Sequence, residues 1–510
     1  MKEPSFNVLD EPWIPCMDLQ GNYRNFGIRD LLAAAHELRA IRFQNPLSDV
    51  AVLRVLLAVI HRAINGPRNG AEWKNMYSEG RFGEQISGYL DRWHHRFDLF
   101  SNDKPFYQTP GLAVVDATGR EVPQTAGLIT LGISSGNNKT LFDHTLDDAP
   151  VRLTPAEAAA SLLTAQMFSL GGLNKKTTNL FGYQQSFLNG AMVNGIFIIL
   201  TGNILFETLM LNLLIYDGGN EPIPVTPQDC PVWEREDLGV TSATTPRGYL
   251  DYLTCKCRHI RLVPSSIENE TTVEYVHLAQ GEAFPMVENP GVFRRKNKKG
   301  EWYAPSLDVN RLVWRDSTAL FAFDDHDDRR PKAFVQIRSF RRIVDLPSRY
   351  LCSVYGLANE KANPLAWRRE TLDVPISLLF EKSAVAYLKK AMDLAEKTYL
   401  ILNQSVKIYM KEYLPEKSKD VSEKAKSTRT VDTFWDRTEG YFHQFLREMD
   451  SPDQAAERWH EALKKTAMES LNLCLDGRYR NTARTFRAWN AAVAYLSTRL
   501  DNIVKGGTKR

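Results

Sequence analysis

The sequence predicts an α+β protein, with a large mixed α/β domain over residues 1–378 followed by an all-α four-helix bundle over residues 379–510. Three observations predict this. The chain has 510 residues, too many for one ordinary hydrophobic core. Short β-rich runs alternate with helical patterns before Leu379. After Leu379 the strand signal stops and four amphipathic helical segments follow.

In the first domain, apolar periodicity predicts helices over Ile28–Leu38 and Asp49–Ile64. A third helix is expected from Thr154 to about Phe168, because Thr154 and Glu157 form a capping box around Pro155 at the first helical position. Strands are expected at three places: Trp302–Pro305, Ala319–Phe323 and Ala333–Arg338.

In the second domain, apolar residues recur at spacings of three and four over residues 388–409, 434–445, 459–471 and 486–500. Each segment has one apolar stripe, which must be buried against another helix, so the four together favour a bundle. Ser451-Pro452 is typical of the start of the third helix, and Asp476-Gly477 of its end. The polar, lysine-rich stretch 415–430 is expected to be a loop.

Composition excludes several classes of protein. Hydrophobic content of 43% and charged content of 25% are typical of a soluble globular chain, and no apolar stretch is long enough to span a membrane. Six cysteines do not form a disulfide framework at this length. Cys255, Cys257 and His259 lack a fourth zinc ligand. The chain is therefore expected in the cytoplasm, without metal or cofactor.

One acidic run suggests an enzyme. Asp324, Asp325, His326, Asp327 and Asp328 could serve a metal-dependent phosphohydrolase or nuclease. However, successive side chains in a turn between two strands splay apart and do not converge on one ion. A solvated turn is the better interpretation, and no nucleotide-binding or hydrolase motif occurs elsewhere. We therefore expect no catalytic residues, with the phosphohydrolase as the alternative.

Cationic side chains cluster between residues 290 and 345, where Lys and Arg outnumber Asp and Glu by thirteen to eight. Such clusters are typical of phosphate contacts, although solvated turns and strand faces produce them too. The candidate phosphate-binding residues in this region are Arg294, Arg295, Lys296, Arg338, Arg341 and Arg342.

Two irregular segments are further candidates for nucleic-acid contact. Residues 131–150 form a long polar stretch around Phe142, with Asp143 and His144 beside it, and long ordered loops are often functional. Residues 171–190 combine Gly182 with the cations Lys175 and Lys176, and glycine lets the backbone approach a ligand closely. A disordered surface loop is the alternative for the first segment, and the pattern in the second is a weak signal by itself.

Several separated blocks resemble, in the same order, the large subunit of the type I-E CRISPR surveillance complex, Cascade. The blocks are Phe6 to Pro15; Phe97 to Phe100 with Lys104-Pro105-Phe106-Tyr107-Gln108-Thr109; the loop around Phe142; the segment ending at Gly190; and Tyr355 to Ala362 with Trp367 to Glu370. The helical C-terminus completes the order, so the resemblance spans nearly the whole chain.

The resemblance implies a non-catalytic subunit of an RNA-guided antiviral complex. Its partners would be the other Cascade subunits, the guide CRISPR RNA and target double-stranded DNA. The family recognises the protospacer-adjacent motif (PAM) in the duplex, largely from the minor groove, and helps open the duplex for guide pairing. It then helps recruit a helicase-nuclease effector.

The resemblance also assigns roles to residues. Phe142, with Asp143 and His144, matches the loop that contacts the PAM region and the guide end. Gly182 matches the glycine whose backbone approaches the motif. Four residues match the hairpin tip that wedges into the duplex, or lie directly beside it: Asn359, Glu360, Lys361 and Ala362. This sequence has Lys361 where relatives can carry Gln. It also has no lysine at residues 280–283, where the family's motif-reading lysine is expected, so Arg294 or Arg295 would substitute.

Overall fold

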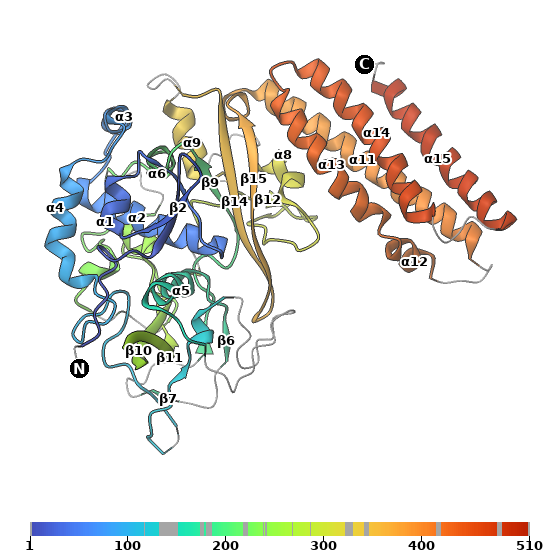
Figure 1. Cartoon of the computed structure of the whole chain (residues 1–510). Helices are drawn as coiled ribbons and strands as arrows, with labels where there is room; N and C mark the ends of the chain where they lie inside the picture. Colours follow the sequence, from blue (N-terminus) through green and yellow to red (C-terminus); the bar gives the residue numbers. More distant parts are fainter. Residues whose placement is uncertain are drawn as a thin grey trace. The chain divides into compact units, whose positions relative to one another are not determined.

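The computed structural model describes residues 3–507 except 117, 132–150, 174–177, 180–185, 218–222, 238, 240–241, 268, 286, 322–329, 341–345, 415–419 and 477–481. The chain forms two compact units (Figure 1). Unit 1 comprises Met1–Val309 and Asp325–Thr371, and unit 2 comprises Asn310–Asp324 and Leu372–Arg510. The predicted boundary at 378/379 therefore falls later than the structural one and misses the segment 310–324.

Unit 1 begins with a small antiparallel sheet of order β2-β1-β3. Its elements are β1 (Ile14–Asp18), β2 (Tyr23–Phe26), α1 (Ile28–Ala33) and β3 (Leu38–Ile41). The predicted helix to Leu38 ends early because residues 38–41 pair with β1 instead. The predicted helix over Asp49–Ile64 is confirmed as α2 (Pro46–Ile64), which is buried from Leu47 to His61.

The first two blocks of the resemblance contact each other. The Val8 amide donates to the Phe97 carbonyl at 3.0 Å, and the Leu99 amide to the Phe6 carbonyl at 2.9 Å. Trp13 is buried, and its indole N–H donates to the Val8 carbonyl at 2.9 Å. These blocks are therefore part of the framework of unit 1. Helices α3 (Gly70–Glu79) and α4 (Glu84–Trp93) and the turn η1 (His94–Arg96) lie between them in sequence.

The central part of unit 1 contains α5 (Pro155–Phe168), whose capping box at Thr154 and Glu157 confirms the prediction. The other elements of regular structure here are β4 (Val114–Val115), β5 (Gln124–Thr125), η2 (Ala126–Ile129), β6 (Gly172–Leu173), β7 (Thr178–Asn179), β8 (Ser186–Phe187), β9 (Ile196–Thr201), α6 (Leu205–Asn212), η3 (Val232–Glu234), α7 (Tyr249–Leu253), β10 (Arg258–Ile267), β11 (Glu270–Gln280), β12 (Arg295–Lys296) and β13 (Trp302–Tyr303). The small strands pair as β4 with β7, β6 with β8 and β12 with β13.

Two strand predictions are wrong. Residues 333–338 lie in α9 (Lys332–Ser339), because Ala333, Phe334 and Ile337 are buried together at helical spacing after Pro331. Residues 319–320 end α8 (Ser317–Leu320), which follows the turn η4 (Val313–Asp316), and Phe321 is its C-cap. The predicted strand at Trp302–Pro305 is confirmed in part, as β13.

The longest strands of unit 1 form a hairpin. Strand β14 (Arg349–Glu360) lies between β15 (Asn363–Pro375) and β9 in a sheet of order β15-β14-β9. Figure 1 shows the two long strands running side by side to a narrow turn. This hairpin contains the last block of the resemblance.

Unit 2 confirms the predicted helical C-terminal region. It contains α10 (Ser377–Phe380), α11 (Lys382–Tyr413), α12 (Val421–Ser427), α13 (Thr430–Arg447), α14 (Pro452–Asp476) and α15 (Ala483–Gly507). Helix α11 packs against α13, α14 and α15, and α13 packs against α14. Helix α12 lies inside the stretch that was predicted to be a loop. No helix among the described residues is long and apolar enough to cross a membrane.

The segment 310–324 belongs to unit 2 because its aromatic and cationic side chains pack on α13. The Trp314 ring stacks on Phe442 with centroids 4.7 Å apart. The Arg315 guanidinium carbon lies 3.6 Å from the centroid of the Trp435 ring, a cation–π contact. No periodicity in the sequence could indicate this contact, because it joins residues more than a hundred positions apart.

Candidate nucleic-acid interface

The β14–β15 hairpin is anchored at its base and exposed at its tip. Strand β14 pairs with β9 from Leu351 opposite Thr201 to Gly356 opposite Ile196, and then continues to Glu360 without this partner. Side chains from Cys352 to Ala358 are buried, whereas Glu360 and Lys361 are exposed. The buried part fixes the direction of the hairpin, and the exposed turn extends beyond the sheet.

The turn of this hairpin has an uncommon backbone. Lys361 has φ of +55°, in the left-handed region that residues other than Gly and Asn rarely adopt. Tight hairpin turns often require positive φ because it matches the strand twist. The Asn359 side-chain nitrogen Nδ2 donates to the Lys361 carbonyl at 2.8 Å and closes the turn. A strained residue held at an exposed tip supports a functional hypothesis for Lys361.

The tip lies beside β6. A Cβ placed on Gly172 would be 3.7 Å from the Cβ of Ala362. Strands β6 and β8 precede and follow residues 174–185 in the chain and pair with each other, and we call this pair the frame of residues 174–185. The structure therefore brings the hairpin tip to the frame of the glycine-containing segment. Lys175, Lys176 and Gly182 themselves lie outside the described residues, as do Phe142, Asp143 and His144.

Polar side chains bind the backbone on either side of this frame. The Leu188 amide donates to the Gln280 side-chain oxygen at 2.6 Å, and the Gly171 amide to the Asn189 side-chain oxygen at 2.7 Å. The Arg258 guanidinium donates to the Leu170 carbonyl at 2.9 Å and lies over the Phe187 ring. Sequence reasoning missed Arg258 and Gln280 because nothing in a strand sequence marks which polar residues turn inward.

A buried carboxylate holds the base of the hairpin. Asp49 on α2 accepts from the Phe43 amide at 2.8 Å and forms an ion pair with Arg369 of β15 at 3.3 Å. Burial raises the pKa of Asp49 to about 7, although the Phe43 amide and Arg369 act in the opposite direction. The neighbouring Arg368 donates to the Asp308 carbonyl at 2.9 Å. Arg368 and Arg369 therefore position the hairpin.

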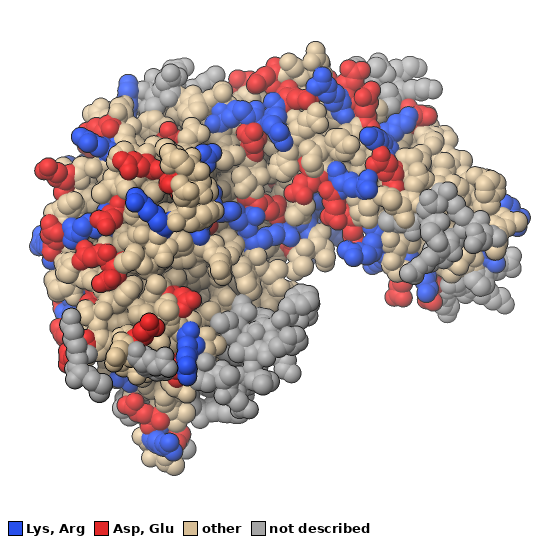
Figure 2. Space-filling view, in the orientation of Figure 1, with Lys and Arg blue, Asp and Glu red and all other residues tan. Residues whose placement is uncertain are grey.

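Several of the candidate phosphate-binding side chains already have partners within unit 1. Arg294 forms an ion pair with Glu288. Arg295 donates to the Tyr303 hydroxyl at 2.7 Å, and the Lys296 ammonium lies 5.1 Å from the Trp302 ring centroid. Arg338 is half-buried on α9, and Arg341 and Arg342 lie outside the described residues. On the face in Figure 2, blue and red side chains are interspersed, so charge alone does not identify an interface.

The side chains of Cys255, Cys257 and His259 form hydrogen bonds within unit 1. The Cys255 and Cys257 thiols contact the Gln166 and Ala165 carbonyls, and burial raises the pKa of Cys255 to about 12. His259 bonds to the Thr109 hydroxyl at 2.8 Å. Among the described residues, no three His, Cys, Asp or Glu side chains are placed to hold a metal ion. The acidic run 324–328 lies outside those residues.

Comparison with known proteins identifies the family. The profile of the family described as CRISPR-associated protein Cse1 matches residues 7–470. The CRISPR-associated protein CasA/Cse1 of Thermus thermophilus is 29% identical over 485 residues, covering 91% of each chain. The crystal structure of CasA from Thermus thermophilus superposes with a TM-score of 0.79 and 25% identity, covering 98% of this chain and all of that one. A chain of a CRISPR RNA-guided surveillance complex shares the fold, with a TM-score of 0.77, 20% identity and coverage of 97% and 100%. The chain therefore belongs to the Cse1 (CasA) family of CRISPR-associated large subunits.

Proposed function

We propose that this chain is a non-catalytic subunit of Cascade that recognises the PAM in double-stranded DNA and opens the duplex beside it. The observation that carries this proposal is the exposed tip at Lys361, held by a buried hairpin base and lying next to the frame of residues 174–185. Membership of the Cse1 family supports it, as does the shared fold with a chain of an RNA-guided surveillance complex.

The geometry suits a wedge. Unstacking a base step costs a few kcal/mol, so an inserted tip must not bend away from the duplex. The pairing of β14 with β9 and the ion pair between Arg369 and Asp49 supply that rigidity. Residues 174–185, which connect the paired strands β6 and β8, would read the minor groove, where few contacts give permissive recognition. Arg295 and Lys296 on β12 would add contacts to phosphate that weaken with salt.

The partners follow from the same proposal. They are the other Cascade subunits, the guide CRISPR RNA, target double-stranded DNA and a helicase-nuclease that is recruited after pairing. Base pairing with the guide would read the target sequence, and this chain would check only the flanking motif. The working compartment would be the cytoplasm. Phe142, Asp143, His144 and Gly182 would contact the motif region.

The test measures binding and opening separately. The complex is reconstituted with guide RNA on duplexes with randomised flanks. Gel shift then reports binding, and a fluorescent base analogue beside the motif reports opening. Lys361→Asp should impair opening more than initial binding, because an acidic tip is repelled by phosphate when it inserts. Lys299→Asp makes the same change in the exposed turn between β12 and β13 and should spare opening. Phe142→Ala should weaken assembly or motif selection without unfolding the chain.

Equal losses of binding and opening in Lys361→Asp would contradict the wedge. Tight binding without any flank preference would contradict PAM recognition by this chain. Divalent-metal-dependent cleavage by the isolated chain that disappears in Asp325→Ala would instead support the phosphohydrolase alternative.

A further inference from the structure

Unit 1 contains a polar cavity that involves neither the hairpin tip nor the frame of residues 174–185. Its volume is about 170 Å³. It lies between the segment 103–110, which includes one block of the family resemblance, the turn η3 with the residues that follow it, and Lys256. One water occupies roughly 30 Å³ in the liquid, so the cavity has room for a small polar ligand together with water.

Lys256 is one of three buried cations among the described residues that line this cavity, with Arg96 and Arg235. The residue is 6% exposed, and its ammonium nitrogen donates to the Gln108 carbonyl at 3.0 Å. An ammonium has three N–H donors, and among the described residues no second acceptor is recorded for this one. Burial and the nearby charge of Arg235 lower the pKa of Lys256 to about 7, while Glu282 and Asp237 act in the opposite direction.

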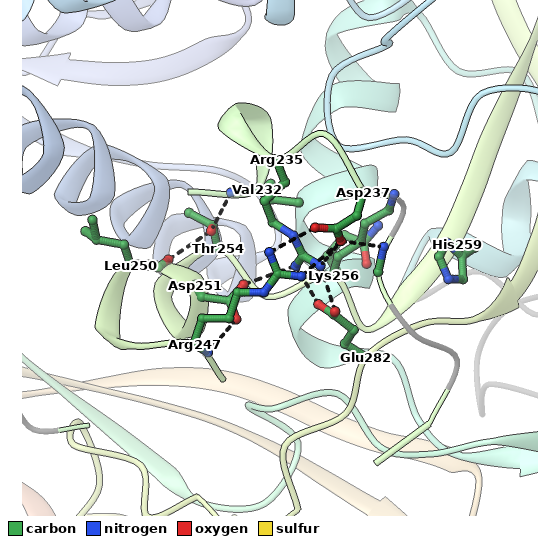
Figure 3. A network of polar contacts seen from close by, with 12 residues as sticks. Val232, Arg235, Asp237, Arg247, Leu250, Asp251, Thr254, Lys256, His259 and Glu282 are labelled. Carbon is green, nitrogen blue, oxygen red and sulfur yellow. Dashed lines mark hydrogen bonds and ion pairs between the residues drawn. The ribbon is translucent and has the colours of Figure 1, made fainter. Parts of the chain in front are cut away.

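The acids around Lys256 form ion pairs with arginine. Arg235 donates to both Glu282 oxygens at 2.7 Å and to Asp237 at 2.8 Å, and it reaches Asp251 at 3.1 Å (Figure 3). Arg247 forms a second ion pair with Asp237. Among the described residues, the Lys256 ammonium therefore donates to a backbone carbonyl and not to a carboxylate. Arg235 Nε also has no partner among the described residues.

The rim of the cavity carries a second cationic pair. Arg96 and Lys104 both contact Glu236, whose side chain is exposed. The lining thus contains four cations, at positions 96, 104, 235 and 256, and three carboxylates, at positions 103, 236 and 237. The buried part offers spare donors, and buried donors without acceptors are costly. Such an arrangement favours a ligand that brings acceptor oxygens and negative charge.

We propose that this cavity binds a small oxyanion, a carboxylate or a tetrahedral phosphate-like group, which accepts hydrogen bonds from the Lys256 ammonium and from Arg235. Binding takes up one proton from solvent when Lys256 is neutral beforehand, and no covalent bond forms or breaks. The groups facing Lys256 are Arg235, Asp237 and Glu282, and none of them lies on the hairpin.

The test is calorimetric titration of the full chain with sulfate and, separately, acetate. Both probes keep a constant charge from about pH 6 to about pH 9. We expect saturable binding at one site, weaker at the upper end of this range, and at about pH 8 a heat that depends on the buffer's ionisation enthalpy because a proton is taken up. A preference for sulfate or acetate would distinguish a phosphate-type from a carboxylate ligand.

Lys256→Met should weaken binding roughly tenfold or more, because a charge-assisted hydrogen bond is lost. Lys104→Met, at the half-exposed rim, should weaken it less, and Lys74→Met on the exposed face of α3 should leave it unchanged. Unsaturable heats with both probes, or unchanged affinity in a folded Lys256→Met chain, would overturn the proposal. If that variant does not fold, wild-type binding that is the same across the pH range would overturn it too.

Discussion

Two lysines of unit 1 occupy opposite environments. Lys361 is exposed at the tip of a hairpin, with an uncommon backbone. Lys256 is buried beneath the segment 103–110, inside a network of acidic and basic side chains. Substitution of Lys361 should cost the fold little stability. The charge state of Lys256, by contrast, depends on burial and on the charged side chains around it. The comparison contrasts an exposed side chain, which is open to a partner, with a buried side chain that is fixed by its neighbours.

Substitution of Arg235 should give the largest loss of stability, and it tests the buried region of this comparison. Its side chain is 2% exposed, and its guanidinium is the main counter-charge of Glu282 and Asp251. Arg235→Met would leave buried carboxylates without a cation, so the free energy of unfolding should fall by about 3–5 kcal/mol in urea denaturation. Arg152→Met, which removes an exposed partner of Glu274, should cost at most about 1 kcal/mol. Equal costs in the two variants would mean that the Arg235 network does not stabilise unit 1.

Sequence reasoning could find only one of these two regions. Periodicity located the helices of unit 2, and the capping box at Thr154 located α5, because both signals are local. The tip at Lys361 was found by resemblance in a continuous block. The network around Arg235 joins residues 47 positions apart, from Arg235 to Glu282, so no local pattern indicates it. The same limit explains the wrong strand prediction at 333–338, because a short apolar run fits both the helical and the strand periodicity until its packing is known.

Substitution of Lys256 should give the second largest effect, which is a change in how the free energy of unfolding depends on pH. Its pKa is about 7 in the folded chain and near 10.5 when unfolded, so the unfolded state binds more protons between these values. Wild-type stability should therefore rise as pH increases from about 7 towards 10, relative to Lys256→Met, by up to a few kcal/mol. Parallel urea titrations of the two chains at several pH values measure this slope. A difference that stays constant with pH would show that Lys256 is not desolvated in the folded chain.

Lys361→Gly should give the smallest effect on stability and the clearest contrast with the buried lysine. Glycine adopts positive φ without steric cost, so the free energy of unfolding should stay the same or rise by less than about 1 kcal/mol. Arg429→Gly in unit 2, at φ of +56°, provides a matched control for this backbone effect. If the tip acts as the proposed wedge, opening of target DNA by the reconstituted complex should nevertheless fall with Lys361→Gly alone, because the wedge loses the side chain that enters the duplex. Strong destabilisation would show that the tip supports the fold, and full opening activity would show that the backbone turn is sufficient as the wedge.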